Sequence, residues 1–175
     1  KDINPCQLDE KAVRKMRSSI LFMGPLLARF HEIDLPEPGG CIIGNRPLDS
    51  HISGFQQLGA QVVKNSRSYK MSVDKLIGSK ITLPEFSVTA TENIIMAAVL
   101  AEGTTIINLA ACEPHVQDLC NFLNKIGAKI SGIGTHQVII EGVKELKGAE
   151  HEIIPDQIEI GTFIILAAAT HGKLK

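Results

Sequence analysis

The segment IIMAAVLAEG, from Ile94 to Gly103, is apolar over almost its whole length and recurs as FIILAAATHG from Phe163 to Gly172. Both copies are predicted helices with almost no polar face. A helix that is apolar on all sides must be buried. The sequence therefore predicts two central helices, at 94–101 and 163–170, inside the protein core.

Other landmarks recur in the same order around these two segments. The matching pairs are Leu58-Gly59-Ala60 with Ile126-Gly127-Ala128, Leu76 to Ser79 with Leu146 to Ala149, and Pro84-Glu85 with Pro155-Asp156. A weaker third copy of the helix lies upstream, at Ile20 to Arg29. Common helix composition alone could produce one match, but an ordered series predicts repeated structural units.

Each unit follows one order of elements. After the helix at 94–101 the pattern predicts a strand at 104–108, a helix at 116–126 and a hairpin of 129–131 with 138–140. A further strand at 152–154 is expected to close the unit. Upstream, a helix is predicted from Asp9 to Ala28, with Asp9 as its N-cap and a kink at Pro25. The expected fold is α/β, with three pseudo-repeats, central helices and peripheral sheets.

Composition limits the classes of function. The chain has 175 residues, 44% of them apolar, and a net charge of −1. This balance argues against a nucleic-acid surface, and the longest apolar run, Phe163 to Ala169, is too short to span a membrane. The four cysteines, Cys6, Cys41, Cys112 and Cys120, show no zinc-site spacing, so no metal is predicted and a reducing cytoplasm is expected.

The loop PGGCIIGNRP, from Pro38 to Pro47, places a cysteine among glycines, with an arginine five residues later. Gly39 and Gly40 allow a sharp bend and a close approach to a ligand. Arg46 could hold an anion and favour the thiolate of Cys41. The loop thus indicates an anion site beside a reactive sulfur, against the alternatives of a spare surface thiol and a solvated arginine.

These residues resemble the UDP-N-acetylglucosamine enolpyruvyl transferase family. The matching stretches are Met16 to Ile20, Gly24-Pro25-Leu26, Pro38 to Ala60, Leu100 to Thr105, Glu113-Pro114, Pro155-Asp156 and Gly161-Thr162-Phe163. The resemblance implies an inside-out α/β fold with two domains, each of three βαβαββ units around buried helices. Residues 1–175 would then be a single domain that lacks the second domain and an N-terminal segment.

The resemblance also implies the reaction. The family transfers the enolpyruvyl group of phosphoenolpyruvate to the 3-hydroxyl of UDP-N-acetylglucosamine and releases phosphate, at the start of peptidoglycan synthesis. The implied partners are these two substrates and the second domain, and no cofactor is implied. The resemblance therefore implies that the chain alone would not catalyse this reaction.

Three residues resemble the catalytic set of the family. Cys41 matches the cysteine that protonates the enol carbon, can carry phosphoenolpyruvate covalently and is alkylated by fosfomycin. Arg46 matches the arginine that contacts phosphate. Asp156 matches an acidic residue near the reacting centre, although a turn residue would look the same.

The implied substrate-binding residues are Arg17, Arg46, Pro47, Leu48, Asp49, Ser50, His51, Ser87 and Val88. Pro47 to Ser50 match the uridine-binding segment, while Asp49 or Ser50 could equally be the N-cap of a helix at 52–58. His51 could reach the same pocket or be structural. Ser87 and Val88 match a helix start that meets the diphosphate.

Two positions depart from the family pattern. Glu85 stands where some members have lysine, and Gln157 where some have arginine. A carboxylate at position 85 would repel a diphosphate, so Glu85 is doubtful as a ligand. Two other functions remain open: a non-catalytic nucleotide-sugar-binding paralogue, and an enolpyruvyl transferase acting on shikimate phosphate. The Gly-Gly-Cys loop argues against both.

Overall fold

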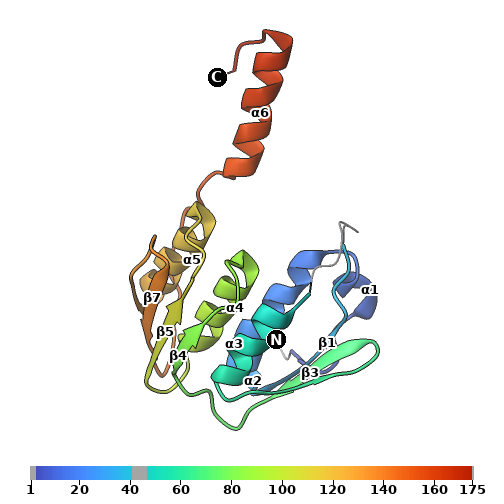
Figure 1. Ribbon diagram of the computed structural model, residues 1–175, viewed down its shortest axis with the longest axis vertical. Helices are drawn as coiled ribbons and strands as arrows, with labels where there is room; N and C mark the ends of the chain where they lie inside the picture. Colours follow the sequence, from blue (N-terminus) through green and yellow to red (C-terminus); the bar gives the residue numbers. More distant parts are fainter. Residues whose placement is uncertain (1–2, 41–46, 175) are drawn as a thin grey trace.

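The computed structural model describes residues 3–40 and 47–174, which form a body of helices and two sheets, with one helix projecting from it (Figure 1). The elements in chain order are α1 (Glu10–Val13), the 3₁₀ helix η1 (Arg17–Phe22), α2 (Met23–Phe30), β1 (Glu32–Pro36), α3 (Asp49–Gln57), β2 (Gln61–Lys64), β3 (Ser68–Ser72), β4 (Lys80–Thr82), α4 (Val88–Ala98), β5 (Thr104–Asn108), α5 (Pro114–Lys125), β6 (Lys129–Ser131), β7 (Gln137–Glu141) and α6 (Gln157–Thr170).

The two sheets repeat one topology. The first has strand order β1-β3-β2 and the second β4-β5-β7-β6, with antiparallel β1–β3, β2–β3, β5–β7 and β6–β7 pairs. The matched glycines Gly59 and Gly127, just after α3 and α5, both have positive φ, of 96° and 107°. This equivalence confirms the predicted repeat, together with the strand, helix and hairpin expected over 104–140.

The additional strand β4 shows where a unit begins. It pairs in parallel with β5, so α4 is the crossover between them. The complete unit is therefore β4-α4-β5-α5-β6-β7, which is the expected βαβαββ order. The strand between hairpin and central helix opens the next unit; it does not close the previous one, as the sequence had suggested.

Helix α4 forms the centre of the core, as predicted for 94–101. It packs against α2, α3 and η1 on one side and α5 on the other (Figure 1). Ile94, Ile95, Ala97 and Ala98 have no exposed surface. Because each neighbour contributes apolar side chains, the apolar C-terminal half of α4 is covered, while its N-terminal half also carries buried polar residues.

The predicted helix from Asp9 to Ala28 is wrong in its continuity. Asp9 does cap α1, accepting hydrogen bonds from the amides of Lys11 and Ala12. The helix then stops, because Met16 is extended (φ −133°), and the chain resumes as η1 and α2. Pro25 lies in the first turn of α2, where its missing N–H costs no helical hydrogen bond, so no kink is needed there.

Two expectations at the C-terminal end are also wrong. The helix predicted at 163–170 forms within α6, but none of its residues is buried and it extends away from the body (Figure 1). Its burial needs covering elements that the described part of the chain does not supply. Residues 152–154 form no strand. Strand β4 pairs with β5, the strand that follows the helix α4. The equivalent partner of residues 152–154 would be a strand after α6, but residues 172–174 form no strand.

Helices α2 and α4 approach closely at Gly24. A Cβ atom on Gly24 would lie 2.4 Å from the carbonyl oxygen of Asn93. Gly24→Ala should therefore lower the free energy of unfolding by about 1–3 kcal/mol, because backbone must shift to admit the methyl group. Urea unfolding measures the change. Gly161→Ala is the control, since a Cβ there meets nothing within 4 Å; an equal loss in both variants would contradict the packing argument.

Candidate functional site

A cavity of about 260 Å³ collects several of the predicted binding residues, and we refer to it as the Arg17 pocket. It is lined by Arg17, Glu37, Pro38, Pro47, Leu48, Asp49, Ile52, Lys64 and Tyr69. Arg17 comes from η1, Asp49 from the start of α3, and Lys64 from the end of β2. The structure thus brings together Arg17, Pro47, Leu48 and Asp49. Cys41 and Arg46 lie outside the described residues.

The two glycines before Cys41 pack against the chain's own backbone. A Cβ atom would lie 1.8 Å from the carbonyl oxygen of Arg14 at Gly39, and 2.7 Å from the amide nitrogen of Arg17 at Gly40. Gly40 also has φ +97°, a conformation that favours glycine. The sequence predicted a close approach of these glycines to a ligand, whereas the structure shows both of them against the backbone of the Arg14–Arg17 segment. This contact fixes Gly39 and Gly40 beside the residue that lines the pocket.

The pocket carries charges of both signs. Arg17 and Lys64 are its cations, and Glu37 and Asp49 its carboxylates. The Lys64 ammonium lies 5.4 Å from the centre of the Tyr69 ring. A hydrogen bond with Tyr69 is the main cause that raises the pKa of Lys64, and Glu37 and Asp49 add to it. Such a site offers both donors and acceptors to a polar, anionic ligand.

Sequence reasoning missed Lys64 and Tyr69. They lie on neighbouring antiparallel strands and are register partners. No motif marks either residue, because their position at the pocket depends on the pairing of β2 with β3. An alternation of exposed and buried residues along the hairpin would be the only local signal, and it does not identify a binding site.

Ser50 and His51 are buried and engaged inside the protein. The Ser50 hydroxyl donates to the Glu85 carboxylate at 3.0 Å, which directs Glu85 toward α3. His51 is 3% exposed and contacts Thr89 and Asn93 through its two ring nitrogens. The N-cap position of α3 is Leu48, without a side-chain hydrogen bond, so the predicted capping role of Asp49 or Ser50 is wrong.

Ser87 and Val88 mark the start of α4, as the helix-start interpretation predicts. The Ser87 hydroxyl oxygen accepts a hydrogen bond from the Ala90 amide at 3.4 Å, which is the geometry of an N-cap. Thr91 in turn donates its hydroxyl to the Ser87 carbonyl at 2.8 Å. These bonds fix the first turn of α4.

Asp156 lies apart from the Arg17 pocket. Its carboxylate caps α6 by accepting from the amides of Ile158, at 2.8 Å, and Glu159, at 3.3 Å. It lines a separate cavity of about 350 Å³ together with Pro114, His115 and Asp118 of α5. The structure therefore supports the turn-and-cap reading of Asp156 and does not bring it together with the other predicted residues.

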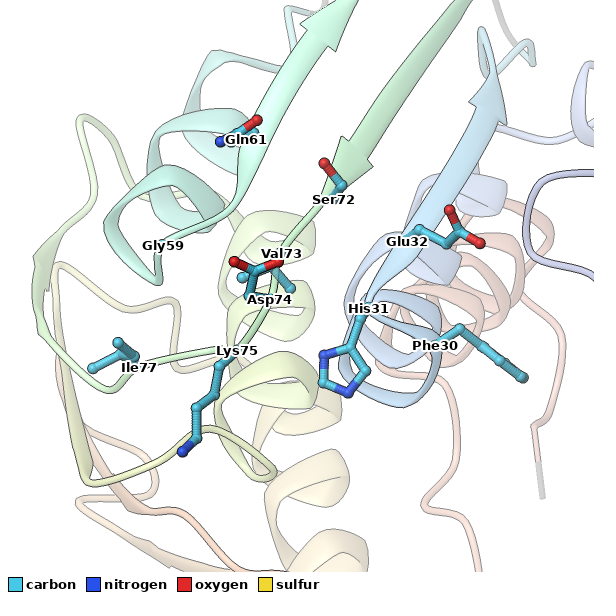
Figure 2. A pocket seen from close by; sticks show the side chains of 10 residues that line it. All are labelled: Phe30, His31, Glu32, Gly59, Gln61, Ser72, Val73, Asp74, Lys75 and Ile77. Atoms are coloured by element: carbon cyan, nitrogen blue, oxygen red, sulfur yellow. The ribbon is translucent and has the colours of Figure 1, made fainter.

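A third cavity, of about 530 Å³, contains none of the predicted site residues. Figure 2 shows it between the α2–β1 turn, with Phe30 and His31, and the segment after β3, with Asp74 and Lys75. The Lys75 ammonium pairs with Glu102. Volume alone does not make this hollow a functional site, because it gathers no catalytic constellation.

Neither a metal centre nor a membrane helix is found in the part of the chain that the structure describes. Among residues 3–40 and 47–174, no group of three or more His, Cys, Asp or Glu side chains could hold a metal ion. Over the same residues, no helix has the length and hydropathy needed to cross a bilayer.

The burial of His51 predicts a pH-dependent stability. Burial lowers its pKa from 6.5 to about 4, and the nearby Arg17 guanidinium adds to the effect. Between these values the unfolded chain binds a proton that the folded chain does not. The stability is therefore full above pH 6.5 and falls as the pH drops toward 4, by about 3 kcal/mol for this group.

Urea unfolding of the wild type and of His51→Asn at pH 7 and pH 4.5 isolates this contribution, because all other groups titrate in both proteins. The wild type should lose more stability than the variant over this interval. Equal losses would show that His51 does not stay neutral in the folded state.

Comparison with known proteins gives one family and one set of relatives. The EPSP synthase (3-phosphoshikimate 1-carboxyvinyltransferase) family matches residues 2–175. UDP-N-acetylglucosamine 1-carboxyvinyltransferase of Treponema denticola is 56% identical over 173 residues, which cover 99% of this chain and 40% of the relative. The corresponding protein of Coxiella burnetii is 51% identical over 164 residues, covering 93% of this chain and 38% of the relative. The chain thus spans about two fifths of the relatives' length.

Solved structures show the same fold at low sequence identity. The enolpyruvyl transferase NikO from Streptomyces tendae aligns with a TM-score of 0.76 and 19% identity, covering 92% of this chain and 38% of that protein. EPSP synthase from Acinetobacter baumannii aligns with a TM-score of 0.64 and 21% identity, covering 87% and 34%. These likenesses confirm the predicted α/β fold.

Proposed function

Because the chain belongs to the EPSP synthase (3-phosphoshikimate 1-carboxyvinyltransferase) family, we propose that it is part of a longer UDP-N-acetylglucosamine 1-carboxyvinyltransferase. That protein would transfer the enolpyruvyl group of phosphoenolpyruvate to the 3-hydroxyl of UDP-N-acetylglucosamine and release phosphate. Relatives at 51–56% identity carry this name, which favours it over the transferase acting on shikimate phosphate. The activity is assigned to the longer protein, since the chain spans 40% of the relative from Treponema denticola.

The Arg17 pocket is the observation that carries the proposal. Four residues selected for nucleotide-sugar binding line one cavity, although Arg17 lies far from Pro47, Leu48 and Asp49 in the sequence. In the proposed complex, Asp49 and the adjacent backbone bind uracil, and Arg17 donates to the nucleotide sugar. The start of α4, at Ser87 and Val88, favours the diphosphate through the positive end of the helix.

The chemical roles fall on the loop between Gly40 and Pro47. In the proposed reaction Cys41 gives a proton to C3 of phosphoenolpyruvate while the sugar 3-hydroxyl oxygen bonds to C2 and its proton passes to a carboxylate base of the second domain. The Cys41 thiolate then takes a proton back from C3 as the bond between C2 and the phosphate oxygen breaks, which restores the double bond and releases phosphate. Arg46 stabilises the phosphate, and Asp156 is assigned to the reacting centre once the second domain is in place.

The remaining assignments concern partners and location. The second domain of the longer protein is the proposed partner of this chain, and no nucleic-acid partner is proposed. We place the protein in the cytoplasm, supported by the unpaired state of Cys6, Cys112 and Cys120.

Phosphate release by the longer protein tests the proposal directly. We expect release from phosphoenolpyruvate when UDP-N-acetylglucosamine is added, and none with shikimate 3-phosphate. The reverse preference would assign the protein to the other transferase. Binding of the nucleotide sugar without phosphate release with either acceptor would support the non-catalytic paralogue.

Arg17→Ala should weaken binding of UDP-N-acetylglucosamine to the longer protein about 10- to 100-fold, because a charge-assisted hydrogen bond is lost. Isothermal titration calorimetry measures this effect. Arg29→Ala, which removes the same charge at an exposed position of α2 outside the pocket, is the matched control. Equal affinities of both variants would remove Arg17 from the site.

A further inference from the structure

A buried amide joins the elements that surround the Arg17 pocket. Asn93 of α4 has no exposed surface. Its side chain contacts the Gly24 amide at 2.9 Å, the Ile20 carbonyl at 3.0 Å and Nδ1 of His51 at 3.0 Å. One side chain thus connects η1, α2 and α3 to α4.

The partners fix the orientation of the Asn93 amide. The Gly24 N–H can only donate, so it bonds to Oδ1 of Asn93. The two hydrogens of Nδ2 then go to the Ile20 carbonyl and to His51. Every donor and acceptor of this fully buried amide faces a complementary group, which is the arrangement that fixes a unique packing.

The same logic fixes the tautomer of His51. Its Nδ1 accepts from Asn93 and carries no hydrogen, so the neutral ring holds its proton on Nε2. Nε2 lies 3.2 Å from the Thr89 hydroxyl oxygen and donates to it. The line Asn93–His51–Thr89 therefore runs from the centre of α4, through α3, back to the first turn of α4.

The bonds of Asn93 reach two elements that also carry residues of the pocket. Ile20 lies one 3₁₀ turn after Arg17, and His51 lies two residues after Asp49. Arg17 is also near enough to His51 to lower the pKa of the imidazole. A shift of Asn93 would therefore change the spacing between the guanidinium of Arg17 and the carboxylate of Asp49.

We propose that Asn93 and His51 are positioning residues for the nucleotide sugar: through the bonds of Asn93 to Ile20 and His51, they set the spacing between Arg17 and Asp49. This inference rests on the proposed function. Neither residue touches the substrate, and neither takes part in proton transfer. Their effect falls on binding of UDP-N-acetylglucosamine rather than on the chemical step.

Asn93→Asp in the longer protein is the first test. One carboxylate oxygen can still accept from Gly24, but the other faces the Ile20 carbonyl and Nδ1 of His51, where donors are lost. We expect the KM for UDP-N-acetylglucosamine to rise about 10-fold, with kcat and the KM for phosphoenolpyruvate changed less than about 2-fold.

Asn124→Asp is the matched control. Asn124 of α5 also makes paired bonds, accepting from the Ile130 amide at 2.8 Å and donating to its carbonyl at 2.9 Å, away from the pocket. The Asn124→Asp variant should have a lower free energy of unfolding and an unchanged KM for UDP-N-acetylglucosamine. Equal KM changes in the two variants would overturn the proposal.

A pair of His51 variants provides the rescue. His51→Asn keeps an acceptor where Nδ1 lies and should keep the KM within about 3-fold of wild type, whereas His51→Leu leaves Asn93 with an unpaired hydrogen and should raise it about 10-fold. If both variants raise the KM equally, the bond to Asn93 does not position the site.

Nitrogen-15 NMR of the His51 ring gives a readout that does not depend on turnover. The wild type should show the neutral Nε2–H tautomer at pH 7, and Asn93→Asp should show the imidazolium, because a carboxylate now faces Nδ1. A wild-type Nδ1–H tautomer would refute the hydrogen bonds assigned between Asn93, His51 and Thr89. If the longer protein released no phosphate but showed the expected tautomer, the proposed function would be wrong while the hydrogen bonds of Asn93 and His51 would be confirmed.

Discussion

Cys41→Ser in the longer protein should slow phosphate release about 10²- to 10⁴-fold, the usual contribution of a general acid or base. A thiol is a much stronger acid than a serine hydroxyl, so cysteine can donate a proton at neutral pH where serine cannot. Binding of UDP-N-acetylglucosamine, assigned to the Arg17 pocket, should change less than about 2-fold. A coupled phosphate assay and calorimetry measure the two effects.

Cys112→Ser is the matched control, since Cys112 is a half-buried thiol with no role in the proposed reaction. It should keep the wild-type rate. Intact mass after fosfomycin treatment provides a second readout: wild type and Cys112→Ser should gain one adduct, and Cys41→Ser none. Full turnover by Cys41→Ser would remove the thiol from the mechanism.

The second large effect concerns the chain studied alone. Helix α6 exposes a continuous apolar surface, with Ile158 71%, Ile164 56% and Ile165 70% exposed. We expect the 175-residue chain to bind the dye ANS and to self-associate at micromolar concentration, because apolar patches of this kind are rarely left in contact with water. Sedimentation velocity measures the association.

Ile165→Glu should weaken this self-association about 10-fold or more, since it places a charge on the surface that becomes buried. Val63→Glu is the matched control, because Val63 is a 56% exposed apolar residue on β2. A chain that sediments as a monomer and leaves ANS dark would contradict the prediction, as would equal effects of the two substitutions.

The sequence predicted the elements whose stability depends on local pattern. Helix α4 and strand β5 follow from apolar periodicity, and the matched glycines Gly59 and Gly127 end α3 and α5 where only a positive φ fits. Burial of α6 could not be predicted in the same way. A uniformly apolar helix is expected to pack against other elements on all sides, but the helix sequence does not tell whether those elements are present.

The resemblance predicted several residues of the candidate site. It could not predict residues whose position at the site depends on tertiary contacts. The grouping of Arg17 with Asp49 followed from the resemblance. The role of His51 could not be read from its neighbours in the sequence, because Asn93, more than forty positions away, takes one of its ring nitrogens. Lys64 and Tyr69 reach the pocket only through the pairing of β2 with β3.

The parallel pairing of β4 with β5 has an evolutionary consequence. In a recombinant joined between β4 and α4, β4 would come from one relative and β5 from the other, so the side chains along this parallel pair would not match. Crossovers placed in the connections before Lys80 and after Glu141 would keep all four strands together. Chimaeras between relatives should therefore be more stable when the joints lie in these connections than when they lie between β4 and α4.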